Sequence, residues 1–358
     1  MATELQNAFL SLVRLGIGNT QIARLPQNID WKAMEDLAAR QGLSAIIVDG
    51  IEKLTEEQRP PQMVLLQWIA ETLQSYEYRY ELYRRTIAEL AAFYNQHGFK
   101  MMIVKGFACN LDWPKPEHRP CGDIDIWQFG QYKEADAVLA KEKGIKIDKN
   151  HHHHTIFTWR DFLVENHYDL LNLYQHHSNI ELEKIVKKLA EDDTHFFDVY
   201  GEKVYLPSAN LHALFLLRHA MTHFTATEIT LRQLLDWAFF TKEHGKEVNW
   251  EWLLGVLEQY GMTRLFNIFN AICVEDLGFE VSIFPQVQFE PFLKDRVLND
   301  ILSPEFKEQE EGNNIKRYLL KYRRWQANKW KHELSFNDSR WSAFWTGVWG
   351  HLLKPKSI

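Results

Sequence analysis

The stretch MMIVKGFACNLDWPKPEHRPCGDIDIWQF, residues 101–129, decides the fold of this chain. It begins with an apolar run that ends at Lys105-Gly106, and it closes with an Asp-Ile-Asp-Ile sequence at residues 123–126. Side chains alternate between the two faces of an extended segment, so Asp123 and Asp125 are expected on one face. The isoleucines are then expected on the other face, in an apolar core.

Two carboxylates on one face of a strand predict a cation site. They repel each other and are costly unless a cation lies between them. Their oxygen ligands and their negative charge suit Mg²⁺ or Mn²⁺. The pattern therefore predicts a buried strand that carries a site for a hard divalent cation, with Asp123 and Asp125 as its ligands.

These motifs together resemble those of a known family. Lys105-Gly106, followed by Arg-Pro-Cys-Gly-Asp-Ile-Asp-Ile at residues 119–126, is similar to the pattern of the uncharacterised bacterial nucleotidyltransferases, a subgroup of the DNA polymerase β-like nucleotidyltransferase superfamily. The superfamily usually has Gly-Ser or Gly-Gly at the turn, where this chain has Gly106-Phe107. The resemblance covers about residues 99–242. It implies an α+β fold with a small mixed-sheet nucleotidyltransferase core, flanked by N-terminal and C-terminal helical regions.

A later segment supplies candidates for the third acid, which the superfamily takes from a neighbouring strand. A period of two places Glu165, His167 and Asp169 on one face of this segment. The sequence Val-Glu-Asn-His-Tyr at residues 164–168 resembles the subgroup's valine-glutamate-leucine-histidine-tryptophan, and Asn166 departs from that pattern. The resemblance implies Glu165 as the third carboxylate, and Asp169 is the alternative.

The resemblance also implies an NTP substrate and a site for two metal ions. Asp123 and Asp125 would bridge both ions, while Glu165 would complete the shell of the second ion and accept a proton from the acceptor. Gly106 would let the backbone approach the phosphates closely. A short helix predicted at residues 106–111 would offer free N–H groups to them.

Three further side chains are candidates for contacts with the nucleotide. Lys105 could pair with a phosphate oxygen as a point charge, or it could lie at a solvated strand end. Arg119 could likewise reach a phosphate, or it could form a salt bridge near the strand. His167 is a candidate because it shares a face with Glu165.

Two histidine patterns could bind a metal, but another interpretation is favoured for each. The run at residues 151–154 can bind transition metals, yet a solvated loop or strand edge is favoured. Within this run His154 is the candidate for a substrate phosphate, because it lies nearest the next strand. His219 and His223 share one helical face but lack the glutamate of the zinc-peptidase motif. Hydrogen bonds to Asp236 or to the backbone are favoured for this pair, with a substrate-facing role left open.

Three regions are expected along the chain. A helical lead-in packed on the core occupies residues 1–98, the nucleotidyltransferase-like core occupies 99–206, and a C-terminal helical domain occupies 207–358. A helix is predicted after the capping residue Asp30, and amphipathic spacing predicts another over residues 62–96. Apolar runs and turn residues predict strands at 101–104, 123–129, 145–148, 155–159 and 162–168.

The segment KRYLLKYRRWQANKWK, residues 316–331, interleaves basic and aromatic side chains. Such a segment could grip nucleic acid or lie on a membrane. The favoured interpretation is a surface helix whose aromatic side chains pack inward, with the acidic residues 305–311 offsetting its charge. A last amphipathic helix that contains Trp341, Trp345 and Trp349 is most simply interpreted as core.

The bulk composition limits the classes of function. The chain has 358 residues, of which 46% are hydrophobic and 25% charged, and its net charge of -7 argues against nucleic acid as the main partner. Cys109, Cys121 and Cys273 are unclustered, which favours a reducing cytoplasm over a disulfide framework. The N-terminus carries no basic region followed by a long apolar run, and no stretch reaches the length of a transmembrane helix.

The sequence therefore predicts a metal-dependent nucleotidyltransferase. It would move an NMP group, with AMP the expected one, from an NTP to a hydroxyl of a small molecule or protein. The acceptor, the preferred base and the oligomeric state are not specified by the residues. One alternative is a catalytically silent nucleotidyltransferase fold that binds a nucleotide or a partner, and another is a nucleic-acid-binding module that uses residues 316–331.

Overall fold

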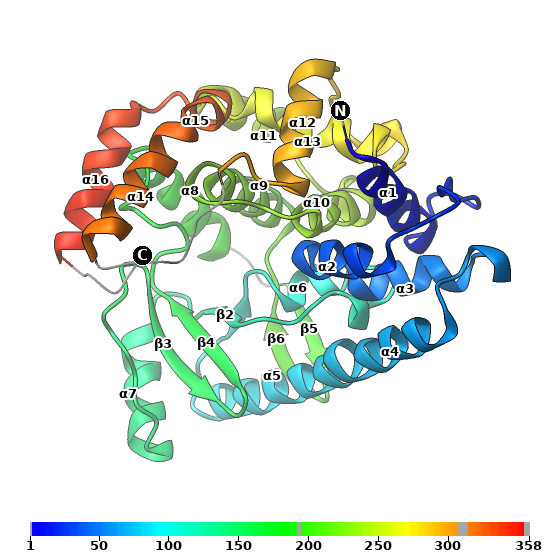
Figure 1. Ribbon diagram of the computed structural model, residues 1–358. Helices are drawn as coiled ribbons and strands as arrows, with labels where there is room; N and C mark the ends of the chain where they lie inside the picture. Colours follow the sequence, from blue (N-terminus) through cyan, green and yellow to red (C-terminus); the bar gives the residue numbers. More distant parts are fainter. Residues whose placement is uncertain (1, 192–194, 307–313, 354–358) are drawn as a thin grey trace.

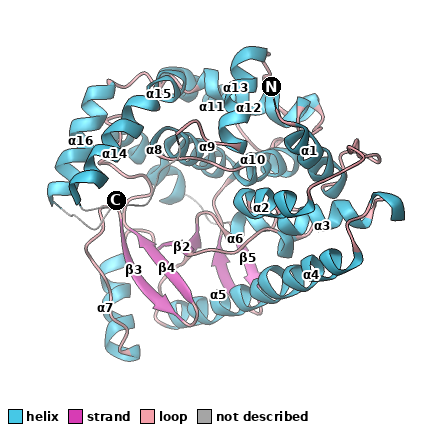
Figure 2. Ribbon diagram, viewed as in Figure 1, coloured by secondary structure: helices cyan, strands magenta, loops and turns pink. Residues whose placement is uncertain are grey.

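Helices make up most of the structure, and they surround one mixed β-sheet (Figure 1 and Figure 2). The computed structural model describes residues 2–191, 195–306 and 314–353. The prediction of an α+β fold, with a small mixed sheet flanked by helical regions, is confirmed. Within the described ranges, no helix is both long and apolar enough to cross a membrane.

The sheet combines parallel and antiparallel pairs. Its strands are β1 Met102–Ile103, β2 Ile124–Trp127, β3 His154–Trp159, β4 Phe162–His167, β5 Phe196–Val199 and β6 Glu202–Tyr205. They lie in the order β3-β4-β2-β1-β6-β5. The pairs β1–β6 and β2–β4 are parallel, and the pairs β1–β2, β3–β4 and β5–β6 are antiparallel. The strands β2 and β4, which carry the candidate ligands Asp125 and Glu165, are therefore direct neighbours.

The helices fall into two groups by their place in the chain. Those before β6 are α1 Glu4–Gly16, α2 Trp31–Gln41, α3 Ser44–Glu52, α4 Gln62–Thr72, α5 Arg79–Gln96, α6 Phe107–Asn110, α7 Tyr132–Lys143 and α8 Asn179–Glu191. Those after β6 are α9 Ala209–Ala226, α10 Leu231–His244, α11 Trp250–Gln259, α12 Thr263–Glu275, α13 Pro291–Leu302, α14 Asn314–Ala327, α15 Lys329–Ser335 and α16 Arg340–Leu353. A π-helical segment, Leu73–Tyr78, joins α4 to α5.

Local capping signals set helix boundaries where the sequence predicts them. The carboxylate of Asp30 accepts a hydrogen bond of 3.0 Å from the N–H of Ala33 at the start of α2. Gly42 ends the same helix with a φ of 66°, a left-handed conformation that glycine adopts without a steric penalty. These boundaries follow from the local sequence alone.

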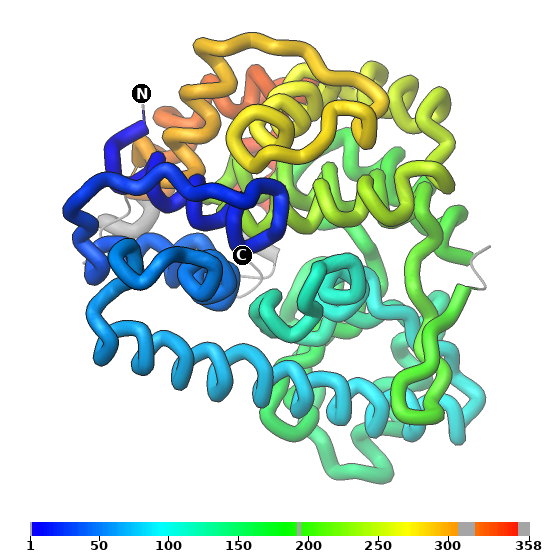
Figure 3. The backbone as a smooth tube through the Cα atoms, turned by 90° about the vertical axis from the view of Figure 1, so that its right-hand side faces the viewer, coloured from blue at the N-terminus to red at the C-terminus, as the bar shows by residue number. Residues whose placement is uncertain are grey.

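The sheet divides the apolar core into two parts. Ile124 and Ile126 are fully buried in one cluster with Ile87 of α5. Val104 and Trp127 belong to the other cluster, which they share with the C-terminal helices. Figure 3 shows α4 and α5 as one long helical stretch across the lower part of the molecule, with the C-terminal helices in the upper part. Strand alternation thus turns the isoleucines away from the acids, as the sequence predicts.

The first helices share a core with the last ones. Phe9 and Leu12 of α1 are fully buried in the same cluster as Leu214 of α9 and Phe266 of α12. The division at residues 98 and 206 remains a prediction. The shared cluster shows that the two helical ends of the chain are packed as one body around the same face of the sheet.

Two parts of the core differ from the sequence prediction. Residues 145–148 form no regular strand, because only Asp148 pairs there, through an isolated bridge to Ile156 of β3. The β5–β6 hairpin and α8 are not predicted by the sequence patterns. β5 lies at the edge of the sheet with Phe196 and Phe197 52% and 38% exposed, so burial imposes no clear alternation on it.

The interpretation of the last helix as core is wrong. Trp341, Trp345 and Trp349 of α16 are 57%, 56% and 63% exposed. The helix packs on one side only, where the ring of Phe344 lies 4.8 Å from the ring of Trp325 in α14. The other aromatic side chains face outward because no element covers them within the described ranges.

Residues 316–331 follow the surface-helix interpretation only in part. Arg323 is exposed and Trp325 is half-buried, as that interpretation expects. Lys331 is only 1% exposed, and its Nζ lies 2.5 Å from Oδ2 of Asp300. The ion pair holds this end of the segment inside the helical core rather than in solvent. The acidic residues 307–311 and the side chains of residues 316–318 lie outside the part of the chain that the structure describes.

Candidate active site

Parallel pairing of β2 and β4 brings two of the predicted acids together. Asp125 is paired with Glu165, and Trp127 is paired with His167, so Glu165 and His167 share the face of Asp125. Suitable ligand atoms of Asp125, Glu165 and His167 all lie within 4.8 Å of one another. The strand register thus assembles a group of two carboxylates and one imidazole.

Asp125 lies at the centre of this group and is 1% exposed. Its Oδ1 is 2.9 Å from Nζ of Lys105 and 3.0 Å from Nε2 of His167. Burial raises the pKa of Asp125, but the charge of Lys105 and the hydrogen bond from His167 outweigh burial and hold it well below its usual range. Asp125 is therefore an ionised, buried carboxylate that is already paired with the ammonium group of Lys105 and hydrogen-bonded to His167.

Glu165 has the opposite electrostatic character. Its side chain is 17% exposed, and burial together with the negative charge of Asp125 raises the pKa of Glu165 to about 7. A carboxyl group with such a pKa can exchange a proton near neutral pH. The two acids of the pair are thus set for different tasks by their surroundings.

Asp123 flanks this group rather than joining its closest contacts. It lies just before β2 and is partly buried, and its backbone carbonyl accepts a hydrogen bond of 2.8 Å from the hydroxyl of Tyr83. Burial and the charge of Asp125 raise the pKa of Asp123. The charge of Asp123 in turn raises the pKa of Lys105. The structure therefore places Asp123 within electrostatic reach of the other acids.

Gly106 occupies a position that only glycine fits. Its φ is 59°, and a Cβ atom there would lie 2.8 Å from Oη of Tyr83. The predicted short helix follows it as α6, over Phe107–Asn110. The turn that resembles the nucleotidyltransferase motif is therefore built around close packing of the backbone against α5.

Lys105 is not a solvated strand end, so that alternative is wrong. Its side chain is 23% exposed and directed at Asp125, and its Nζ lies 3.4 Å from Nε2 of His219 on α9. Burial lowers the pKa of Lys105, but the charges of Asp125 and Asp123 outweigh it and the net shift is upward. Lys105 is therefore a charged ammonium group held over the acids.

Arg119 adopts the salt bridge, the second of its two predicted alternatives. It is 5% exposed, and its Nε and Nη2 donate hydrogen bonds of 2.7 and 3.0 Å to the two carboxylate oxygens of Asp236. Its Nη1 donates to Oδ1 of Asn110 at 3.1 Å. These contacts use the guanidinium inside the protein, so Arg119 holds the loop before Asp123 rather than a phosphate.

The run at residues 151–154 leads into β3, an edge strand of the sheet, so the strand-edge interpretation fits, but the expected solvent exposure is wrong for two of its four histidines. His152 and His154 are 5% and 6% exposed, and His154 is the first residue of β3. The carbonyl of His153 accepts hydrogen bonds of 2.9 and 3.1 Å from the N–H groups of Tyr168 and Asp169. These bonds draw the run across the end of β4, which places Nδ1 of His154 3.6 Å from Oε2 of Glu165.

The remaining predicted residues lie around this group. Asp169, the alternative third acid, pairs with Lys187 at 2.5 Å instead. The expected hydrogen bond from His219 or His223 to Asp236 is wrong, because Asp236 accepts from Arg119 and from Trp113, and His219 faces Lys105.

Asn166, which departs from the subgroup pattern, is fully buried on the opposite face. It donates hydrogen bonds of 2.9 Å to Gln128 and 2.9 Å to Asp136, so a polar contact replaces the apolar residue of the pattern.

Sequence reasoning missed two features of this site. One is the place of His153 beside His154 and His167, and the other is the contact of His219 with Lys105. Ligand atoms of His153, His154 and His167 lie within 4.8 Å of one another. Oδ1 of Asp125 therefore has a lysine on one side and a set of imidazoles on the other. The run of four histidines was the available signal for His153, but the contact of His219 joins residues 114 positions apart and leaves no local pattern.

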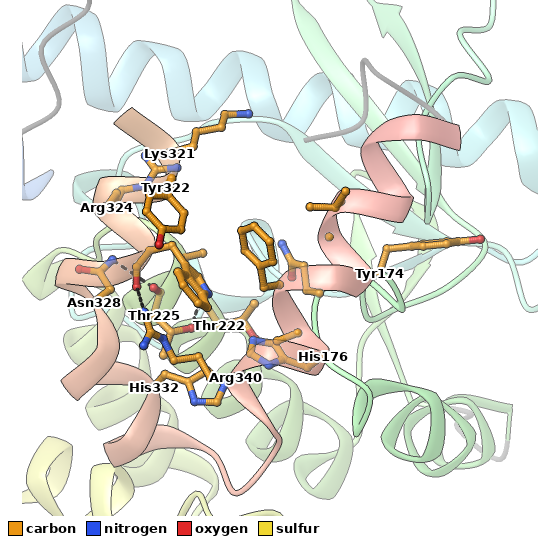
Figure 4. Close-up of a pocket in the computed structure, with 17 residues that line it drawn as sticks. Tyr174, His176, Thr222, Thr225, Lys321, Tyr322, Arg324, Asn328, His332 and Arg340 are labelled. Atoms are coloured by element: carbon orange, nitrogen blue, oxygen red, sulfur yellow. Dashed lines mark hydrogen bonds between the residues drawn. The ribbon is translucent and has the colours of Figure 1, made fainter. Parts of the chain in front are cut away.

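A cavity of about 530 Å³ lies between the C-terminal helices and the segment that follows β4 (Figure 4). Tyr322 and Arg324 of α14, Thr222 of α9 and Tyr174 are among its lining residues, and Figure 4 shows the side chain of Tyr174 extending away from the other labelled side chains. The ring of Tyr174 also lies 4.1 Å from the ring of His152. Tyr174 therefore lines the cavity and contacts the histidine run at residues 151–154.

The family comparison covers this site. The model of a family described as uncharacterised nucleotidyltransferase matches residues 27–278. Among solved structures, the chain is similar to an antigenic nucleotidyltransferase-like protein from Paracoccidioides brasiliensis, with 14% sequence identity, a TM-score of 0.33, and coverage of 45% of this chain and 75% of that one. No curated protein matches the chain. Because the family match spans more than half of the sequence, this protein belongs to the uncharacterised nucleotidyltransferase family.

Proposed function

We propose that this protein transfers a nucleotidyl group from an NTP to a hydroxyl group of an acceptor, with Mg²⁺ or Mn²⁺ as the metal. The pairing of Asp125 with Glu165 on adjacent parallel strands, with Asp123 beside them, is the observation that carries this proposal. AMP is the group expected from the resemblance. A location in the cytoplasm, expected from the cysteine content, also remains a prediction.

The residues divide the chemistry among themselves. Asp123, Asp125 and Glu165 would hold the divalent ions, which neutralise the triphosphate and lower the pKa of the attacking hydroxyl when bound. Glu165 would accept the proton of that hydroxyl, directly or through a water molecule. The acceptor oxygen then bonds to the α-phosphorus, and the bond from that phosphorus to the bridging oxygen breaks, releasing pyrophosphate.

Lys105 and the turn at Gly106 would bind the phosphates. In the structure the ammonium of Lys105 lies 2.9 Å from Asp125, where it compensates a buried negative charge. A metal ion on Asp125 would take over that compensation and leave Lys105 to pair with a phosphate oxygen. His167 and His154 lie beside Glu165 and remain candidates for contacts with the nucleotide.

The direct test is pyrophosphate release from each of the four common NTPs, with Mg²⁺ or Mn²⁺ and a panel of hydroxyl-bearing acceptors. We expect release that needs both a divalent metal and an acceptor, and that stops when a chelator is added. Binding of Mg-NTP in a calorimeter without pyrophosphate release from any acceptor would favour the catalytically silent alternative.

The cavity beside the histidine run is the proposed place for the acceptor. Its wall is aromatic, from Tyr322, Trp325 and Phe344, and basic residues, among them Arg324 and Arg340, lie at its side. Aromatic walls favour a planar or apolar body, and guanidinium groups favour an anionic substituent. The acceptor would therefore be an amphipathic molecule that carries an anionic group and a hydroxyl.

Replacing Phe344 by Ala should raise the KM for the acceptor and lower kcat/KM about tenfold or more, because an acceptor that covers this aromatic ring would lose about 1.5–3 kcal/mol of binding energy without it. Calorimetric affinity for Mg-NTP should stay unchanged. Trp349→Ala is the matched control, since Trp349 lies on the same helix, is 63% exposed and does not line the cavity. Equal losses in both variants would argue against the cavity as the acceptor site.

The nucleic-acid alternative finds less support in the structure. Lys331 is buried in an ion pair with Asp300, and Arg340 lies over the ring of Trp325 at 3.7 Å. The ammonium group of Lys331 and the ring of Trp325 are therefore already in contact with other side chains, although a nucleic-acid strand would have to bind such groups. The basic-aromatic segment therefore fits a wall of the cavity better than an open binding surface.

A further inference from the structure

Three imidazoles converge at one end of the sheet. His153 lies just before β3, His154 begins β3, and His167 ends β4 opposite His154 in the antiparallel pair. Their ligand atoms lie within 4.8 Å of one another. Oε2 of Glu165 is 3.6 Å from Nδ1 of His154 and 3.6 Å from Nε2 of His167. One carboxylate oxygen thus lies between two imidazoles.

Two of these ring nitrogens are buried without a hydrogen-bond partner. Among the described residues, Nδ1 of His153 and Nδ1 of His154 have none. Buried polar atoms are nearly always satisfied, because leaving one unpaired costs about 1–3 kcal/mol. Two buried imidazole nitrogens without a hydrogen-bond partner, one of them 3.6 Å from Glu165, therefore indicate a ligand-binding site.

The backbone and the outer contacts of the cluster are already fixed. The carbonyl of His153 is held by the N–H groups of Tyr168 and Asp169. Nδ1 of His167 lies 3.3 Å from the carbonyl of Asp169, and its Nε2 lies 3.0 Å from Oδ1 of Asp125, so an ion on Nε2 would replace the hydrogen bond to Asp125. Metal-binding histidines usually donate one ring N–H to such an acceptor, which orients the other nitrogen toward the ion.

We propose that His153, His154 and His167 form a second cation site, for a transition-metal ion of the Zn²⁺ or Co²⁺ class, with Glu165 at its edge and next to the carboxylate site for Mg²⁺ or Mn²⁺. Imidazole nitrogen suits such ions, whereas Mg²⁺ prefers oxygen ligands. Three histidine nitrogens with one open position are a familiar set for zinc. The site adjoins the proposed active site at Glu165, but ion binding itself requires no nucleotide transfer.

The arrangement differs from adventitious binding to a histidine run. Only His153 and His154 of the run belong to the cluster, and His167 comes from another strand. The ring of His152 instead packs on Tyr174 at 4.1 Å. A tag-like run would bind through any of its members, whereas the built site depends on particular ones.

Cobalt titration tests the proposal with the full chain and no nucleotide. Visible absorption of bound Co²⁺ and calorimetry with Zn²⁺ would be measured for the wild type and for His153→Gln, His154→Gln and His152→Gln. We expect intense, low-coordinate Co²⁺ bands in the wild type, and an affinity at least about 10- to 100-fold lower in the first two variants. His152→Gln, the matched control, should bind like the wild type. A thermal melt of each variant identifies any that fail to fold.

Equal weakening in His152→Gln would show adventitious binding to the run and overturn the proposal. So would a wild-type Co²⁺ spectrum like that of the hydrated ion. Asp123→Asn separates this result from the proposed function, because Asp123 is outside the cluster. That variant should keep Co²⁺ binding while losing pyrophosphate release, and normal Co²⁺ bands with no turnover in the wild type would sink the transferase proposal alone.

Discussion

Pyrophosphate release should fall at least about 10³-fold when Asp125 is replaced by Asn, because a metal ion that loses a bridging carboxylate forfeits several kcal/mol of transition-state stabilisation. Oδ1 of Asp125 lies 2.9 Å from Nζ of Lys105 and 3.0 Å from Nε2 of His167. The variant also leaves these two side chains without the carboxylate that they contact. Initial rates under saturating NTP and metal measure the loss.

Two further variants separate catalysis from folding. Asp123 is partly exposed, whereas Asp125 is 1% exposed and lies 2.9 Å from Lys105, so Asp123→Asn should cost a similar factor in rate with little change in melting temperature. Asp169→Asn is the matched control, since Asp169 is a nearby carboxylate that pairs with Lys187. Retention of wild-type rates by Asp125→Asn, or a comparable loss in Asp169→Asn, would contradict the assignment.

The sequence predicts the features of this site that depend on neighbouring residues, namely the strand with the two aspartates and the glycine turn. Alternation alone places Asp123 and Asp125 on one face and buries Ile124 and Ile126 on the other, because a strand has a fixed period of two. The need for glycine at position 106 is visible in the same way, since the turn between a strand and a helix has few other solutions. The fold class was implied by the resemblance of these motifs to the nucleotidyltransferase pattern.

The rest depends on contacts between distant segments. The burial of His152 and His154 accompanies hydrogen bonds that residues 168 and 169, just after β4, donate to the backbone of the run, and no pattern within residues 151–154 predicts these bonds. From sequence alone, a run of polar side chains is expected in solvent, because the partners that would allow its burial are not visible. The edge strand β5 is not predicted because most of its side chains are exposed, so its sequence lacks the alternation of apolar and polar residues that marks a half-buried strand.

Arg119 and Asp236 show how such a contact can serve the site from a distance. The pair joins a loop of the sheet region to α10, and Nε1 of Trp113 donates a further hydrogen bond of 2.9 Å to Asp236. Arg119 is four positions before Asp123, so the pair anchors the approach of the chain to the acids. The same Arg-Pro-x-Gly motif that suggested a phosphate contact is therefore explained by this anchoring.

Replacing Asp236 by Asn should lower the free energy of unfolding by about 3–5 kcal/mol, because the variant leaves the buried guanidinium of Arg119 without its counter-charge. The double variant Arg119→Met with Asp236→Leu should recover most of that loss, since it removes both buried charges together. Urea unfolding followed by circular dichroism measures both values.

Arg264 and Glu290 offer a control with the same two-pronged geometry at the surface. Their hydrogen bonds are 2.9 and 2.6 Å long, but the side chains are 57% and 37% exposed. Glu290→Gln should therefore cost less than about 1 kcal/mol, because solvent screens an exposed pair. If Asp236→Asn lowered the free energy of unfolding as little as Glu290→Gln does, burial would not strengthen the contribution of the Arg119–Asp236 pair to stability. The position of Asp123 would then have to be held by other contacts.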